Sequence, residues 1–126
     1  MLRITAEKPG TVTILHLQGR IVNGVEEKSL RKAVLSQTEA SAIVLDLGKV
    51  NTIDARGLGL LLELREWTQA RGVEFRLVNV TKLVKQVLEL TQLTSIFEIS
   101  AEPNKPSGRR SAAALDVNGR SVGLKS

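Results

Sequence analysis

The chain has 126 residues, of which 42% are hydrophobic and none is cysteine. This length suits one domain with a sizeable core, and no apolar run approaches the ~18 residues that a membrane span needs. The lack of cysteine excludes disulfides, thiolate zinc sites and cysteine nucleophiles. The first residues do not have the charged, apolar and small-residue regions of a signal peptide, so we expect a cytoplasmic protein without membrane insertion.

The net charge of +5 raises the question of nucleic-acid binding. Most of this charge lies at the C-terminal end, because the residues from Pro103 to Ser126 include five basic side chains and one acid. Residues 1–102 are close to neutral, and their few aromatic side chains are too apolar in setting for a base-stacking platform. We therefore expect a folded domain over residues 1–102, a flexible basic tail over residues 103–126, and no direct contact with nucleic acid.

The first part of the chain predicts a hairpin followed by a helix. Leu2, Ile4 and Ala6 alternate with polar residues, which is the period of a half-buried strand. A Lys-Pro-Gly turn follows, and residues 11–18 form a second, more apolar strand, which together indicate an antiparallel hairpin. A loop over residues 19–24 then leads to a helix that starts near Val25 or Glu26, with its acidic residues at the positive end.

The middle of the chain predicts a buried strand and a long helix. Residues 42–47 are apolar apart from Asp46, as expected for a strand deep in a sheet. The helix that follows runs to about Ala70, where Arg71 in the last turn and Gly72 just beyond it are typical of a helix end.

The last elements are a strand, a helix and a short closing segment. Residues 73–80 alternate again, Thr81 is a candidate N-cap, and apolar residues at helical spacing continue from Leu83 to Leu90. The core is expected to be closed by Ile96, Phe97 and Ile99. The order of elements predicts an α/β fold: a small mixed sheet, with an N-terminal antiparallel hairpin followed by β-α-β crossovers.

The start of the central helix is the most informative stretch. The Asp54 carboxylate can accept hydrogen bonds from backbone N–H groups of the first helical turn. Gly57 and Gly59 remove side chains from that turn, so another backbone or a partner surface can come close. In α/β proteins, binding sites commonly lie at such strand-to-helix junctions.

Leucines surround the first turns of this helix, although a sheet can cover only one of its faces. Spacing assigns the core stripe to Leu60, Leu61, Leu64 and Trp67. Leu58 and Leu62 are then candidates for an outer face that includes the two glycines. The alternative is an ordinary capped crossover helix without a docking role.

Three segments resemble one known family. Residues 53–59, Ile-Asp-Ala-Arg-Gly-Leu-Gly, resemble the I-D-S-x-G-L-G signature of STAS domains, the fold of bacterial anti-sigma factor antagonists. Residues 19–22 resemble the glycine-led turn before the first helix of the family, and residues 87–99 its closing helix and last short segment. The resemblance covers roughly residues 2–100 and implies a STAS-like sheet packed with about four helices.

The resemblance also implies a switch that this chain lacks. In antagonists of this type, the residue after the aspartate is a serine that the anti-sigma kinase phosphorylates, which adds negative charge at the contact surface. Here that position is Ala55, which has no hydroxyl, and Arg56 follows it. Three interpretations stay open: an antagonist that is always active, an adaptor outside the sigma pathway, or phosphorylation of a nearby hydroxyl such as Thr52.

The resemblance implies a non-enzymatic interaction module; no cofactor is predicted, because no residue pattern in the sequence demands one. Its partner would be an anti-sigma factor of the serine-protein kinase type, which it would bind so that the sigma factor is released; a homodimer is left open. The predicted contact residues are Asn23, Asp54, Ala55, Arg56, Gly57, Leu58, Gly59 and Leu62. The alternative is a STAS subunit that docks on the ATPase of a membrane lipid ABC transporter, where phosphorylation is not required.

Other candidate sites give weaker signals. Asn23 and Gly24 serve as a turn and cap, or they flank the Asp54 loop at the docking surface. His16 is the only histidine and lies on a predicted strand, where a packing or edge role is usual. No second group is placed by spacing to work with Asp46, which we interpret as structural. No phosphate-binding loop is present, and no metal site is predicted.

Overall fold

The computed structural model describes residues 1–100; the predicted basic tail, residues 103–126, lies outside the described residues. The described part forms five strands and three helices, against about four helices expected for the whole chain. Their bounds are β1 Leu2–Glu7, β2 Val12–Ile21, α1 Val25–Leu35, β3 Ala42–Ile53, α2 Ala55–Ala70, β4 Glu74–Val78, α3 Lys82–Leu90 and β5 Glu98–Ser100.

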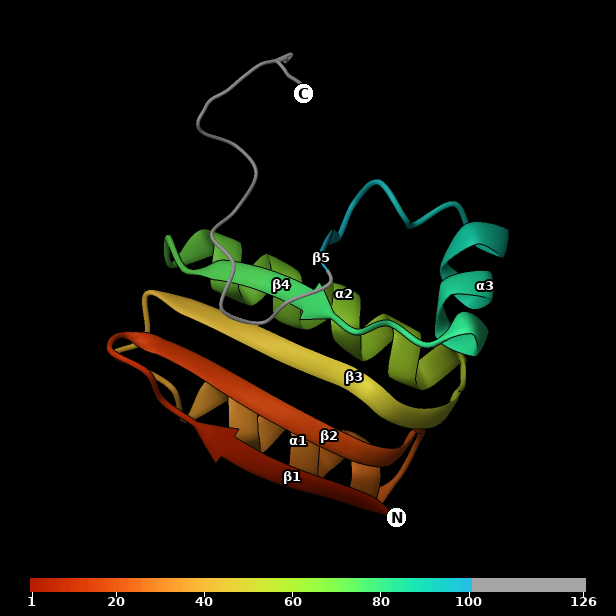
Figure 1. The fold of residues 1–126 in the computed structure, drawn as a ribbon, viewed down its shortest axis with the longest axis horizontal. Coiled ribbons are helices and arrows are strands. Elements are labelled where there is room, and N and C mark those ends of the chain that lie inside the picture. Colours follow the sequence, from red (N-terminus) through yellow and green to blue (C-terminus); the bar gives the residue numbers. More distant parts are fainter. Residues whose placement is uncertain (101–126) are drawn as a thin grey trace.

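The strands form one mixed sheet in the order β1-β2-β3-β4-β5 (Figure 1). β1 and β2 form the predicted antiparallel hairpin, in which Leu2 pairs with Gly19 and Glu7 with Ile14. β2, β3, β4 and β5 are parallel to one another, since each pair is joined by a helical crossover. The predicted α/β class with a mixed sheet is confirmed.

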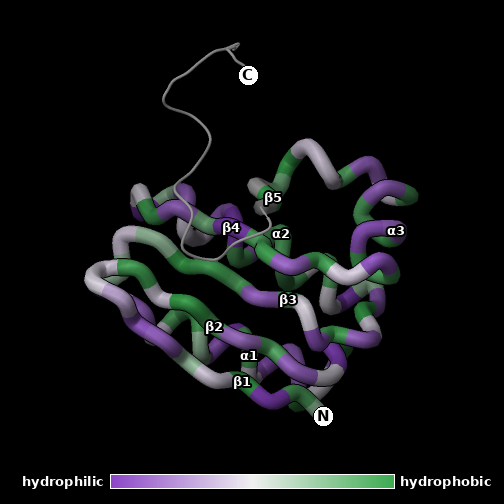
Figure 2. Tube along the Cα trace, in the orientation of Figure 1, coloured by the Kyte–Doolittle hydropathy of each residue, from purple (hydrophilic) through white to green (hydrophobic). Residues whose placement is uncertain are grey.

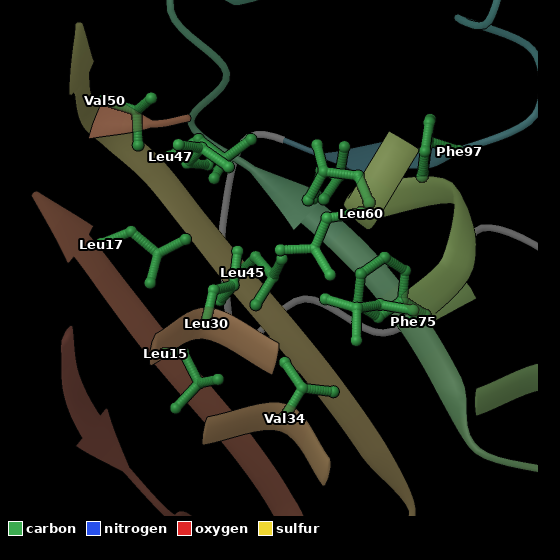
Figure 3. Close-up of a cluster of buried hydrophobic side chains, with 14 of the residues drawn as sticks. Leu15, Leu17, Leu30, Val34, Leu45, Leu47, Val50, Leu60, Phe75 and Phe97 are labelled. Carbon is green, nitrogen blue, oxygen red and sulfur yellow. The ribbon is translucent and has the colours of Figure 1, made fainter. Parts of the chain in front are cut away.

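The main core lies between the sheet and the helices. It collects alternate strand residues, such as Leu15 and Leu45, with the apolar stripes of all three helices, including Leu30 of α1 and Leu61 of α2. In Figure 3 the side chains of α1 and α2 lie against those of β2, β3 and β4. Phe97 alone of the three predicted closing residues is buried, at 5% exposure, whereas Ile96 and Ile99 are exposed.

The opposite face of the sheet also carries apolar side chains. Ile14, Val44 and Val78 form a second buried cluster with Val12 beside it, and no helix residue belongs to that cluster. This separation follows from the alternation of strand side chains between the two faces of a sheet. Figure 2 shows that β2 and β3 are apolar over much of their length, as two-sided burial requires.

Two strands run further than the sequence predicted. β2 continues into the expected loop as far as Ile21, and β3 continues past Gly48 to Ile53. Ile21 and Ile53 pair with each other at the ends of the two strands. The register between them shifts twice, and Gly19 at the second shift has φ +121 with its α-carbon against the Met1 carbonyl. Bulges of this kind interrupt the alternating pattern from which strands are recognised, so the extensions were missed.

Both ends of α2 are as predicted, but the apolar run of α3 is not all core. Asp54 caps α2, whose backbone ends at Arg71 and Gly72. On α3, Val84 and Leu88 are fully buried, whereas Leu83 is 45% and Leu90 is 85% exposed. A short helix on a sheet buries one stripe only, and these two leucines lie beside that stripe.

Among the described residues, no helix is long and apolar enough to span a membrane.

These burial values give a first prediction. Leu61→Ala removes a fully buried side chain from the main core, so it should lower the free energy of unfolding by about 2–5 kcal/mol. Leu90→Ala is the matched control, because its side chain is already in water and the change should be within about 0.5 kcal/mol. Urea denaturation of both variants measures the difference, and equal losses would contradict the assigned core.

Candidate functional site

The helix starts gather at one end of the sheet. β2, β3 and β4 are parallel, and α1, α2 and α3 begin directly after their carboxyl ends (Figure 1). We call this end the junction, and define it by residues 23–25, 54–59 and 81–83. The Thr81 hydroxyl donates a 3.3 Å hydrogen bond to the Val50 carbonyl of β3, which holds the start of α3 there.

Asp54 connects two segments of the junction. One carboxylate oxygen, Oδ1, accepts a 2.8 Å hydrogen bond from the Gly57 N–H, and the other, Oδ2, accepts a 3.1 Å bond from the Asn23 N–H. These N–H groups of Gly57 and then Asn23 lower the pKa of the Asp54 carboxyl below its ordinary value. Asp54 is therefore both the predicted cap of α2 and a tie to the loop before α1, so that Asn23 lies beside it.

Gly57 faces the inside of the domain. A methyl group in place of its hydrogen would lie 2.0 Å from the Ile21 carbonyl oxygen, so only glycine lets α2 approach the end of β2 this closely. Of the two alternatives that the sequence left open, the approaching group is thus a backbone of the same domain. Gly57 is buried and cannot itself offer contact area to a partner.

The expectation that Leu58 lies on the outer face is wrong. Its side chain is only 9% exposed and belongs to the main core, because the close approach of α2 at Gly57 turns the next residue inward as well. Leu62 is half-buried and packs against the same core, so it offers only part of its side chain. Leu60, Leu61 and Leu64 are buried as predicted.

The outer side of the junction consists of other residues. Ala55, Arg56 and Gly59 are exposed, and no atom lies within 4 Å of a methyl group built on Gly59. The sequence missed two apolar neighbours: Val25 is 75% exposed at the start of α1, and Leu83 is 45% exposed at the start of α3. Their signal was an apolar residue in the first turn of a helix, one step outside the buried stripe.

Arg56 is joined to α1 through a buried acid. Its guanidinium lies 3.4 and 3.5 Å from the two carboxylate oxygens of Glu27, whose side chain is almost fully buried. Glu27 also accepts a 2.9 Å hydrogen bond from Arg31, which in turn pairs with Glu63 of α2. This chain of charges fixes α1 and α2 relative to each other beside Ala55, and it leaves Arg56 67% exposed.

Thr52 is in a strand, not in the loop where it was expected. It pairs with Arg20 across the sheet, is half-buried, and donates its hydroxyl hydrogen to the Asn51 side chain at 3.2 Å. Its hydroxyl is therefore held in place before α2 begins.

His16 and Asp46 form a separate polar cluster on the helix-free face. His16 Nδ1 lies 2.7 Å from Asp46 Oδ2, and Nε2 lies 3.0 Å from Glu7 Oε1. Asp46 Oδ1 also accepts bonds from the Gly48 N–H and the Asn79 amide, at 3.0 and 3.1 Å. The prediction that spacing gives Asp46 no working partner missed this pairing, because the parallel pairing of β2 with β3 creates it.

We interpret this polar cluster as structural. A hollow of about 470 Å³ lies beside it, lined also by Arg3, Thr5 and Lys49, but the imidazole and the Asp46 carboxylate are already engaged with each other and with their neighbours. Among residues 1–100, no group of three or more histidine, aspartate and glutamate side chains is arranged to hold a metal ion.

This geometry defines an α/β domain whose three helices begin at the junction, and comparison with known proteins agrees with it. The chain belongs to the STAS domain family, whose model matches residues 3–105. A Bordetella bronchiseptica protein, BtrV, named for a proposed role as an anti-sigma factor antagonist, is 29% identical over 90% of this chain and 93% of its own.

Solved structures of anti-sigma factor antagonists share the fold. The protein from Mycobacterium paratuberculosis superposes with a TM-score of 0.71 at 21% identity, covering 81% of this chain and 87% of its own. Unphosphorylated SpoIIAA gives 0.67 at 16% identity, covering 79% and 90%. At these identities the likeness concerns the fold alone.

The two glycines of α2 provide a second prediction. Gly57→Ala forces a methyl group against the Ile21 carbonyl and should lower the free energy of unfolding by roughly 1–3 kcal/mol. Gly59→Ala is the matched control on the same helix turn, and it should raise stability by about 0.5–1 kcal/mol, since alanine favours the helix and the space is open. Thermal and urea unfolding report both values, and a neutral Gly57→Ala would contradict the close approach.

A third prediction concerns pH. The hydrogen bonds to Glu7 and then to Asp46 raise the pKa of His16 above its ordinary value. The protonated imidazole therefore stabilises the fold fully below the pKa of the unfolded chain, and this contribution is lost as pH rises through the higher folded pKa. The melting temperature of the native chain minus that of His16→Gln should shrink between pH 6 and pH 9. A difference that stays constant over this range would contradict the charged pair.

Proposed function

We propose that this protein is an anti-sigma factor antagonist that acts by binding and not by catalysis. It would bind an anti-sigma factor of the serine-kinase type in the cytoplasm, and thereby release the sigma factor. The observation that carries this proposal is the outer side of the junction, where Ala55, Arg56 and Gly59 are exposed between two apolar side chains, Val25 and Leu83. Membership of the STAS family and the similarity to BtrV support it.

The contact surface differs in part from the one that the sequence suggested. Asn23, Ala55, Arg56 and Gly59 keep a direct role, with Leu62 at the edge. Asp54, Gly57 and Leu58 act as positioning residues, because Asp54 fixes the segments and the other two are packed inside. Small side chains at Ala55 and Gly59 permit close contact, while the flanking apolar residues would lose their exposure on binding.

Ala55 makes this antagonist constitutively active in our proposal. Without a hydroxyl after Asp54, a kinase partner has no acceptor at the family's position, so binding would not be terminated there by phosphorylation. We do not propose Thr52 as a substitute acceptor, since it is a half-buried residue within β3 whose hydroxyl donates to the Asn51 side chain.

Addition of a negative charge at the junction gives the fourth prediction. Ala55→Glu places a carboxylate at the helix start, which the helix dipole tolerates, so the circular dichroism spectrum should be unchanged. Because the charge lies within the contact surface, pull-down of the anti-sigma factor from the native cell should be lost. Ala70→Glu is the matched control, since it adds the same exposed group at the far end of α2 and should bind as the native chain does.

The outcomes separate the proposals. Retained binding by Ala55→Glu would show that the junction is not the contact surface. Capture of a transporter ATPase in place of an anti-sigma factor, identified by mass spectrometry, would favour the lipid-transporter alternative, for which the lack of a hydroxyl at Ala55 is equally suitable. With the purified kinase and ATP, Ala55→Ser should become phosphorylated and dissociate, whereas phosphate on the native chain would contradict constitutive activity.

A further inference from the structure

β1 is an edge strand with an open hydrogen-bonding side. Its only neighbour among the described strands is β2, and it runs over Leu2–Glu7 without a proline or a bulge in that pairing. Natural sheets often protect such an edge with a proline, a bulge or a very short strand, because an open edge can pair with another chain. β1 has none of these three features, so its free edge is a candidate interaction surface.

The register with β2 shows which backbone groups face that edge. The Arg20 N–H donates a 3.2 Å hydrogen bond to the Met1 carbonyl, so these two residues form a hydrogen-bonded pair. Such pairs alternate along an antiparallel ladder, which directs the backbone groups of Arg3 and of every second residue after it toward β2. The N–H and carbonyl groups of Ile4 and Ala6 therefore point outward from the sheet.

The exposed side chains of β1 are complementary to the same strand in reverse. Arg3, Thr5 and Glu7 are all exposed and alternate with the residues that face the main core. Arg3 forms no ion pair within residues 1–100, and Glu7 uses only Oε1 in its contact with His16. When two copies of β1 run antiparallel with Thr5 opposite Thr5, each Arg3 faces the Glu7 of the other copy.

We propose that a second copy of this chain occupies the edge, paired antiparallel through β1 about a two-fold axis at Thr5. In this register Ile4 faces Ala6 of the second copy, and their outward backbone groups exchange reciprocal hydrogen bonds. Arg3 and Glu7 then meet at non-hydrogen-bonded positions, where facing α-carbons are about 4.5 Å apart and side chains lie closest. Moving the register by two residues would lose both ion pairs, which selects this arrangement.

The pairing also continues the main core from one copy to the other. Leu2 and Ile4 pack against the main core but are only half-buried in a single chain. A two-fold axis perpendicular to the sheet keeps the helices of both copies on one face, so these side chains gain apolar neighbours from the second copy. One pair of strands is a small contact, and we therefore expect a reversible dimer of low affinity.

The dimer is independent of the anti-sigma factor, because β1 contributes no residue to the junction. Since antiparallel pairing reverses one copy relative to the other, the two junctions lie at opposite ends of the joined sheet.

Exchange of the two charges tests the register in the full chain. In analytical ultracentrifugation, the mass of the native protein should rise from that of one chain toward that of two as the concentration approaches the millimolar range. Arg3→Glu places like charges opposite each other and should raise the dissociation constant roughly tenfold. Arg3→Glu combined with Glu7→Arg restores opposite charges and should restore association. Lys85→Glu is the matched control, because it makes the same charge change on the exposed side of α3.

Cross-linking gives a second test that does not depend on affinity, since the native chain has no cysteine. Thr5→Cys brings two thiols together at the axis, at a separation that a disulfide can span, so mild oxidation should link two chains. Thr11→Cys is the matched control, because that threonine is exposed in the turn before β2 and should link only by collision. A native chain that stays monomeric, Thr5→Cys chains that link no faster than the control, or association unchanged by Arg3→Glu would each overturn the proposal.

Discussion

The approach of α2 to the end of β2 is the constraint on which the junction depends. Gly57 permits it sterically, and the Asp54 carboxylate holds it by accepting N–H groups from both α2 and the Asn23 loop. The Asp54 carboxylate is engaged in these hydrogen bonds and Gly57 is buried, so the free outer surface of the helix start consists of Ala55, Arg56 and Gly59. Asp54 and Gly57 therefore position the contact surface, whereas other residues of the segment are the ones exposed on it.

Much of the fold could be predicted from local patterns. The hairpin, both ends of α2 and the order of elements follow from alternation, capping residues and glycine at a helix end. The extensions of β2 and β3 could not be predicted, because bulges break the alternation and their pairing is a long-range property. Proximity of His16 to Asp46 was equally hidden, since it depends on the register of two strands far apart in sequence.

The sequence placed the candidate site at the start of α2, but it could not give the direction in which each side chain there points. Helical spacing gives the relative angles of the side chains, but it does not give the rotation of the helix on the sheet. That rotation is set by the contact between Gly57 and Ile21, and it turns Leu58 into the core. The exposed Val25 and Leu83 could not be recognised, because each lies beside a buried stripe and only packing shows which side is covered.

The shared direction of the three helices gives the molecule an electrical polarity. All of them start at the carboxyl ends of parallel strands, so their backbone dipoles present partial positive charge at the same end. Glu26, Glu27 and Asp54 already compensate part of this field. An anion added at this end would therefore be accommodated by the folded chain while it altered the surface potential that a partner meets. A serine in place of Ala55, as in the signature that residues 53–59 resemble, would therefore let a phosphate change the contact surface while the domain stays folded.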